Sequence, residues 1–419
     1  MSSVLIHSLA FAPDRVSTAY LMTDVAVQLD RLGHEVSVLT TTPHYNPLPS
    51  SAPTSQQLKR RVFGLWYESW LGDVRIWHIT VGDKDARIWA RGLQFLSFHA
   101  MSLILGLFII KRHKVVLCTS PPLTIGIVNW ILCLRWRARS IYKLAELYPD
   151  LAIEQGVIRG RLAIKLWRSL EQLVYSTCSV VVPIAEQFRK TLIDRGVPEN
   201  KIELIPDHVD TNLYRPDASG ELPHIFSELE DQFVVLYAGN IGPFQDWHSV
   251  VSAAGDLIET SVHFVIIGDG SERSWLGSRV TDLGLTNVTL LNYLPRNTIP
   301  AINSFCDIAL IPLTWSGSRG GFPSKIYSTL ASGCPVLVSA PPGSEMARFV
   351  ENAGCGRAVE PESGPALRDA ILKAYEERHL LPREGLRGRE VVERRYSLEA
   401  VCGEYDKLIR RLAREATNG

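Results

Sequence analysis

Short apolar runs separated by polar, glycine-containing turns recur along almost the whole chain. Near its start, residues 4–10 predict a strand, residues 19–32 have the spacing of a helix, and residues 35–41 predict a second strand. Gly33 stands where the helix ends. This order is a βαβ unit, and in such folds ligands bind in the crevice at the carboxyl ends of the parallel strands.

The same alternation continues to the end of the chain and divides it into two halves. Further strands are expected at residues 115–119, 138–145, 179–183 and 202–205, and then at residues 233–238, 263–267, 288–291, 308–312 and 335–339. The segment between the halves, residues 206–216, is polar and turn-rich, which is typical of a domain junction. The pattern therefore predicts an α/β protein of two doubly wound domains, residues 1–205 and 206–395, with a C-terminal helix in residues 396–419 that packs back across the junction.

Residues 93–110 form the most apolar run, and Lys111, Arg112 and Lys114 follow it directly. The run is short for a membrane span and contains polar residues, so we do not expect it to cross a bilayer. It is either a buried core helix or a helix that lies in the membrane interface with its basic flanks at the lipid headgroups. A second run, residues 123–134, is also followed by arginines, which favours the interfacial alternative.

Composition indicates the cellular compartment of the protein, and the charged residues are distributed unevenly between its two halves. The 419 residues are 46% hydrophobic, which is enough for complete cores, and carry no net charge. Residues 1–205 hold 24 Lys+Arg against 16 Asp+Glu, so the totals of 44 and 44 leave 20 against 28 for the rest. Either the first half faces an anionic surface or the two domains simply differ in charge. Seven cysteines without a CxxC pair, and an N-terminus without a secretory signal, predict a cytoplasmic protein with reduced thiols.

The stretch of residues 317–343 carries the clearest candidate for binding chemistry. Arg319 lies in a glycine-rich loop, and Pro323 suits the first position of a helix. Ser324 and Lys325 would follow in the first turn, where unbonded amides and the helix dipole attract anions. This pattern predicts a cradle for a diphosphate, although an ordinary helix with a solvated lysine has the same local sequence.

Two other strand ends place polar or flexible residues at the carboxyl edge of a sheet. Glu146 and Asp150 follow a strand of the first half, where a carboxylate can hold a hydroxyl or act as a base. Asp150 has a second interpretation as the cap of the next helix. Gly239 and Gly242 follow a strand of the second half and free the backbone to approach a ligand, but their string matches neither the dinucleotide nor the P-loop pattern.

Several segments share their order and spacing with one known family. They read LDRLGHEVSVLTTTPHY, AELYPD, IPDHVDTNLYRP, YAGNIGPFQ, VIIGDGSE and PSKIYSTLASGCPVLVSAPPGSE, and they span nearly the whole chain. With them the chain resembles the GT-B glycosyltransferases of family 4, and within these the bacterial branch that builds exopolysaccharide, O-antigen and colanic-acid repeat units. The resemblance implies two Rossmann-like domains that face a central cleft, with a nucleotide-sugar donor in the C-terminal domain and an acceptor in the N-terminal one.

The resemblance also implies which residues bind the donor. The expected contacts are Gly239, Asn240, Ile241, Gly242, Ser324 and Lys325 for the diphosphate, with Arg319 as a helper, and Gly268, Asp269, Gly270, Tyr293 and Leu294 for the base. The family reaction retains the anomeric configuration, with the acceptor hydroxyl attacking on the face that the diphosphate leaves. It implies no protein nucleophile and no metal, because the helix start, the amides and Lys325 stabilise the departing charge.

This chain departs from the family pattern at several positions. Many relatives have two glutamates eight positions apart around this helix, and here Gly320 and Ser328 stand in their places. Relatives also often carry Arg and Lys after the first glycine turn of the C-terminal domain; this chain has neither, so Lys325 must carry more of the phosphate charge. The sugar-contacting histidine of many relatives corresponds to the neighbourhood of Glu146, our second candidate catalytic residue. Glu345 matches a family glutamate at a helix start, where the alternative is a cap.

The expected function is a retaining, metal-independent hexosyltransferase of bacterial polysaccharide and lipopolysaccharide biosynthesis. Its donor would be a nucleotide sugar, UDP-linked rather than GDP-linked, and its acceptor a polyprenyl-diphosphate-linked saccharide. It would need no other cofactor and no nucleic acid, and it would be peripheral on the inner face of the cytoplasmic membrane. Two alternatives stay open: an enzyme similar to the non-hydrolysing UDP-GlcNAc 2-epimerases, which needs no acceptor or membrane, and a non-catalytic binding partner with the same fold.

Overall fold

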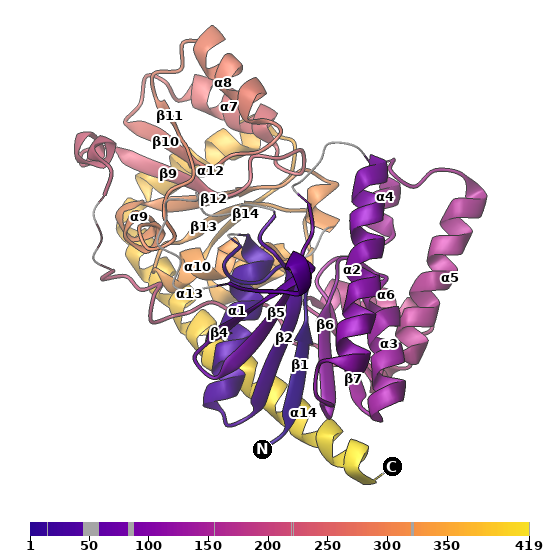
Figure 1. Ribbon diagram of the computed structural model, residues 1–419. Helices are drawn as coiled ribbons and strands as arrows, with labels where there is room; N and C mark the ends of the chain where they lie inside the picture. The colour runs from indigo at the N-terminus through magenta and orange to yellow at the C-terminus, as the bar shows by residue number, and fades with distance from the viewer. Residues whose placement is uncertain are drawn as a thin grey trace. The chain divides into compact units, whose positions relative to one another are not determined.

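The computed structural model describes the chain except for residues 15, 45–57, 83–87, 155, 219, 221, 320, 321 and 419. The chain forms two compact units, one of Met1–Asp207 with Val401–Gly419 and the other of His208–Ala400. The boundary lies two residues after the predicted one. The long C-terminal helix α14 (Leu398–Asn418), yellow in Figure 1, starts in the second unit and continues in the first.

The first unit is built on an eight-stranded sheet in the order β3-β4-β5-β2-β1-β6-β7-β8. Its central strands β1, β2 and β6 are parallel and almost completely buried, as expected for a sheet that is covered on both faces. The strands are β1 (Ser3–His7), β2 (Glu35–Thr41), β3 (Lys59–Arg61), β4 (Trp66–Leu71), β5 (Val74–Ile79), β6 (Val115–Thr119), β7 (Arg139–Leu144) and β8 (Val180–Pro183).

The helices of the first unit are α1 (Ser17–Arg31), α2 (Ile88–Phe108), α3 (Ile125–Trp136), α4 (Asp150–Glu154), α5 (Arg161–Thr177) and α6 (Glu186–Asp194). The helix α3 packs against both α2 and α5, so these three form one layer on the sheet (Figure 1). A buried histidine of β1 fixes this layer: His7 Nδ1 lies 2.8 Å from Asn129 Oδ1 on α3, and its Nε2 lies 3.0 Å from Ser102 Oγ on α2.

The first unit differs from the expectation in two places. The pattern did not predict the strands β3 to β5 beside β2, although β4 and β5 are antiparallel neighbours joined at Gly72, a turn signal. Residues 202–205, expected as a strand, form only an isolated bridge between Ile202 and Val181. An apolar run of four residues after the last strand of a sheet has a single neighbour to pair with, which limits its ladder.

The long apolar helix α2 is in part a core helix, and its membrane-interface alternative stays a prediction. Phe98 and Leu105 are completely buried in the core of the first unit, whereas Leu96, Ile104 and Phe108 are exposed. The second apolar run became α3, most of which is buried. Among the described residues, no helix is both long and apolar enough to span a membrane.

The second unit contains a six-stranded, fully parallel sheet in the order β11-β10-β9-β12-β13-β14. Its strands are β9 (Phe233–Ala238), β10 (Val262–Ile267), β11 (Val288–Leu291), β12 (Ile308–Pro312), β13 (Val336–Ser339) and β14 (Gly356–Val359). Its helices are α7 (Trp247–Asp256), α8 (Arg273–Asp282), α9 (Ile299–Phe305), α10 (Lys325–Ala331), α11 (Glu345–Ala353), α12 (Gly364–Glu376) and α13 (Leu381–Arg395). The helix α7 packs against α8 and α12, while α10 packs against α9 and α13.

Candidate functional site

The predicted donor residues of the second unit gather where its strand order reverses. The strands β9 and β12 are neighbours, and the chain continues from them in opposite directions, to β10 and to β13. The loops after two such strands separate and leave a crevice at the carboxyl edge of the sheet. Gly239 begins the loop after β9, and Lys325 is the first residue of α10, which follows the loop after β12.

Lys325 connects these two loops. Its Nζ lies 3.9 Å from the centroid of the Tyr237 ring, and a Cβ on Gly239 would lie 3.0 Å from the same atom. Burial lowers the pKa of the Lys325 ammonium to about 7, because a charge is disfavoured away from water, and no carboxylate among the described residues pairs with it. An unpaired, poorly solvated ammonium at a switch point favours the binding of an anion.

The glycine turns after β9 and β10 lie against each other. A Cβ on Gly268 would lie 1.8 Å from the carbonyl oxygen of Gly239, and a Cβ on Gly270 would lie 2.2 Å from that of Ile241. Gly239, Gly268 and Gly270 also have φ values of +152°, +150° and +157°, which favour glycine. The structure therefore brings the expected diphosphate turn and the expected base turn together.

The amides of the first turn are mostly engaged, which corrects the expectation that the turn presents them to phosphate. Gly239 N donates to Ile267 O at 2.9 Å, Ile241 N donates to Asp269 O at 2.8 Å, and Gly242 N donates to the side-chain oxygen of Gln245 at 3.0 Å. These bonds hold the two turns together. Within the described chain, only the Asn240 amide of this turn lacks an acceptor, so Lys325 carries more of the predicted role.

The residues expected at the base also gather at this edge. The Tyr293 hydroxyl donates to Asp269 O at 3.3 Å, and Asp269 Oδ1 accepts from Gly270 N at 2.8 Å. Leu294 is half-buried and packs on the core beside them. Sequence reasoning missed Arg273, whose guanidinium donates to Gly268 O at 2.9 Å and thereby fixes the β10 turn. No motif distinguishes this arginine from other arginines at a helix start.

The helix α10 begins two residues later than predicted. Ser324 is its N-cap position and Lys325 its first residue, so Pro323 precedes the helix instead of starting it. Ser328 lies one turn on, half-buried, and its hydroxyl donates to Lys325 O at 2.9 Å. Arg319 ends a short 3-10 turn, but its side chain and the whole of Gly320 and Gly321 lie outside the described residues.

The carboxylates that the sequence singled out have different environments. Glu345 starts α11, but Ser344 is the cap, since its hydroxyl accepts from Ala347 N at 3.2 Å. Asp150 is the first residue of α4, and Arg168 and Arg195 bind its carboxylate at 2.9 Å and 2.6 Å.

Glu146 follows β7 in the first unit and is half-buried. Burial raises the pKa of its carboxyl group, and no donor among the described residues binds it. Glu146 therefore remains the candidate that is open to a ligand, whereas Asp150 has a structural role.

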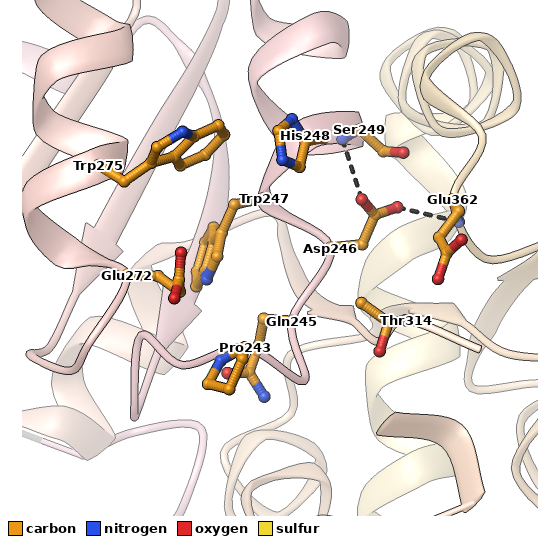
Figure 2. Close-up of a pocket in the computed structure, with 10 residues that line it drawn as sticks. All are labelled: Pro243, Gln245, Asp246, Trp247, His248, Ser249, Glu272, Trp275, Thr314 and Glu362. Carbon is orange, nitrogen blue, oxygen red and sulfur yellow. Dashed lines mark hydrogen bonds between the residues drawn. The ribbon is translucent and has the colours of Figure 1, made fainter. Parts of the chain in front are cut away.

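A pocket of about 400 Å³ opens beside the β9 turn, and Figure 2 shows its walls. None of the predicted donor residues lines it. Asp246 caps α7 by accepting from Ser249 N at 3.1 Å, and its other oxygen accepts from Glu362 N at 2.9 Å (Figure 2). Glu362 Oε1 accepts from Trp315 N at 3.1 Å, so three loops of the carboxyl edge are held together there. The lining residues are Pro243, Gln245, Asp246, Trp247, His248, Ser249, Glu272, Trp275, Thr314 and Glu362.

We expect Gly239→Ala to damage the site without unfolding the second unit. A φ of +152° is unfavourable for alanine, at a cost of about 1–3 kcal/mol, and the new Cβ would displace Lys325 Nζ from 3.0 Å. Ligand binding should weaken by about tenfold, measured by calorimetry. As a control, Gly255→Ala places its Cβ 3.8 Å from Leu285 within a helix and should leave binding unchanged. Equal binding in both variants would contradict this role of Gly239.

Two family models match the chain in succession. The family described as glycosyl transferase 4-like domain matches residues 18–208, and the family described as glycosyl transferases group 1 matches residues 221–390. The putative colanic acid biosynthesis glycosyl transferase WcaI of Escherichia coli (strain K12) is 23% identical over 97% of this chain and 99% of its own length. The probable glycosyltransferase WbjE of Pseudomonas aeruginosa is 23% identical over 73% of this chain and 76% of its own.

Solved structures resemble the whole chain in fold. Sucrose-phosphate synthase from Thermosynechococcus elongatus has a TM-score of 0.73 at 17% identity and covers 98% of this chain and 99% of its own. HepE from Anabaena, in complex with UDP and glucose, has a TM-score of 0.69 at 15% identity and covers 98% of this chain and 100% of its own. These matches confirm the predicted fold class of two Rossmann-like halves.

Proposed function

Because this chain belongs to the family 4 glycosyltransferases with the GT-B fold, we propose that it transfers a sugar from a nucleotide donor to a lipid-linked saccharide in bacterial surface polysaccharide biosynthesis. The observation that carries the proposal is the unpaired Lys325 ammonium at the switch point of the second unit. A nucleoside diphosphate supplies the anion that this ammonium lacks. The relative named for colanic acid biosynthesis supports the polymer class, and the UDP complex of HepE supports a UDP-linked donor.

The proposed reaction retains the anomeric configuration and needs no metal. The bond between sugar C1 and the diphosphate oxygen breaks, and the acceptor hydroxyl oxygen forms a new bond to C1 on the same face. The hydroxyl proton passes to the departing diphosphate. Lys325 stabilises the negative charge that develops on the leaving oxygen, with help from the Asn240 amide. Glu146 belongs to the first unit, and we assign it the orientation of the acceptor hydroxyl.

The proposed acceptor places the enzyme at the inner face of the cytoplasmic membrane. A polyprenyl-diphosphate-linked saccharide keeps its lipid in the bilayer, so the protein must reach the headgroup region. The exposed apolar side chains of α2, followed by Lys111 and Arg112, support peripheral attachment.

Donor and product are tested in two stages with the full-length protein. A panel of UDP- and GDP-sugars is first examined by thermal shift, and the nucleotide sugar that stabilises the protein is then supplied with extracted bacterial lipids. We expect donor-dependent transfer of sugar to the lipid fraction. Conversion of the donor without any acceptor would instead identify an epimerase. Binding without turnover under all conditions would identify a non-catalytic partner.

Donor binding should depend on pH because Lys325 must be charged to pair with the diphosphate. Its pKa of about 7 in the free protein rises when the anion binds, so affinity is highest below pH 7 and falls by about tenfold per pH unit above it. The diphosphate of a nucleotide sugar does not titrate in this range. Calorimetry between about pH 6 and about pH 9 should show uptake of roughly one proton at the alkaline end. Affinity that does not change with pH would rule out Lys325 as the partner of the diphosphate.

A further inference from the structure

The helix α5 carries apolar residues on two sides: Val174 and Tyr175 are buried in the core of the first unit, and a stripe of leucines is exposed. Leu162 and Leu166 are 83% and 69% exposed, and Leu173 continues the same stripe, since the three positions fall within about 40° around the helix axis. Its buried side also holds Glu171, whose side chain is 1% exposed and paired with Arg168 and Arg195. A surface helix normally turns its leucines inward, so the outer stripe requires a partner.

Basic residues border this stripe. Arg161 and Lys165 lie along one side of it, and Val157 and Arg159 extend the same composition into the preceding loop; all four are exposed. We define the α5 face as Val157, Arg159, Arg161, Leu162, Lys165, Leu166 and Leu173. On α4 and α5, the described carboxylate that is exposed near this face is Glu154, at the end of α4. The two other carboxylates on α4 and α5, Asp150 and Glu171, are bound by arginines.

The rest of the helix layer has the same character. Residues 86–145, which include α2 and α3, contain no Asp or Glu but nine Lys and Arg. Exposed apolar side chains continue across the layer with Leu96, Ile104 and Phe108 on α2 and Leu134 on α3. An apolar surface with a mainly basic border is complementary to an anionic bilayer. It is a poor match for a second copy of itself, because a two-fold contact brings like charges together.

We infer that the α5 face lies on an anionic lipid surface, with the leucines among the acyl chains and the basic residues at the headgroups. This inference rests on the proposed lipid-linked acceptor for its purpose, but its evidence is independent of the donor site. The inference assigns the main lipid contact to α5, which sequence patterning did not single out. The exposed apolar residues of α2, Leu96, Ile104 and Phe108, would contact the same lipid surface.

The test uses the full-length protein and vesicles of phosphatidylcholine with or without phosphatidylglycerol. The wild type should sediment with the anionic vesicles, and high salt should weaken this binding. The double variant Leu162→Glu, Leu166→Glu should remain in the supernatant. The double variant Arg161→Glu, Lys165→Glu, which leaves every apolar contact intact, should bind about tenfold more weakly or worse. As a control, Leu283→Glu with Leu386→Glu, two exposed leucines of the second unit, should bind as the wild type does.

Three results would overturn the inference. The wild type could fail to bind anionic vesicles, or the α5 variants could bind them as the wild type does. The wild type could also form a dimer without lipid that the leucine variant does not form. The last would assign the face to a second copy of the chain. The thermal shift caused by the nucleotide sugar is recorded for every variant and should equal the shift of the wild type. Vesicle binding without any nucleotide shift would therefore refute the proposed donor and leave the α5 face intact.

Discussion

Replacing Lys325 with methionine should abolish donor-dependent turnover and, at the same time, stabilise the ligand-free protein. The ammonium contributes to the transition state, where one lost charge interaction costs about 10²–10³-fold in rate. In the ligand-free protein the charged ammonium destabilises the folded state, because burial disfavours the charge and lowers the pKa of Lys325 from 10.5 to about 7. Lys325 is charged in folded and unfolded chains below pH 7, where its cost is complete, and this cost declines as pH rises from 7 toward 10.5.

The stability gain of Lys325→Met at neutral pH should be roughly 1–3 kcal/mol, measured by urea unfolding of the second unit. Methionine keeps much of the side-chain volume over the Tyr237 ring, so packing is preserved. Lys373→Met, an exposed lysine of α12, should change neither turnover nor stability. If Lys325→Met loses stability together with activity, the lysine supports the fold and its assignment to the donor is wrong.

Replacing Lys143 should lower the free energy of unfolding of the first unit by more than any other single substitution that we propose. Its Nζ lies 2.7 Å from Asp207 Oδ1, and the two side chains are 5% and 9% exposed. Although burial opposes the charge, the Asp207 carboxylate raises the pKa of Lys143. The Tyr405 hydroxyl lies 3.5 Å from the same Nζ, so β7, the end of the first segment and α14 meet at this lysine.

Lys143→Met leaves the Asp207 carboxylate buried without its partner, which costs about 3–5 kcal/mol. Urea unfolding followed by fluorescence should show the loss. Lys143→Met combined with Asp207→Leu should recover most of the stability, because a matched apolar pair avoids the uncompensated charge. Lys190→Met, an exposed lysine of α6, should stay within about 0.5 kcal/mol of the wild type. A double variant that is no more stable than Lys143→Met would show that packing, not charge, explains the effect.

Sequence patterning predicted most of the parallel strands because they read as short apolar runs, and all of those except the half-buried edge strand β11 are largely buried. The strands β2, β6, β9, β11 and β12 have the predicted bounds. It missed β3, whose residues Lys59–Arg61 are all basic and exposed. An edge strand is stabilised by backbone pairing with a single neighbour, so its side chains need no apolar pattern.

The candidate site was predictable in its residue types but not in its contacts. A lysine at a helix start after a glycine-rich loop pointed to Lys325, and glycines after β9 and β10 pointed to close turns. The sequence could not show that the Gly239, Ile241 and Gly242 amides bond within the protein, since these partners depend on how two turns meet. The exposed leucine stripe of α5 was hidden for a similar reason, because helical spacing alone does not say which apolar residues face the sheet.

The central claim is that a nucleotide sugar binds at Lys325, and residue-resolved acylation tests it most directly. A lysine with a pKa of about 7 is largely uncharged at mildly alkaline pH and reacts with an amine-acylating reagent, and mass spectrometry reports each lysine separately. The account predicts that the stabilising nucleotide sugar protects Lys325 and leaves the labelling of Lys373 unchanged. Equal labelling of Lys325 with and without a nucleotide sugar that is bound would place the donor elsewhere and contradict the account.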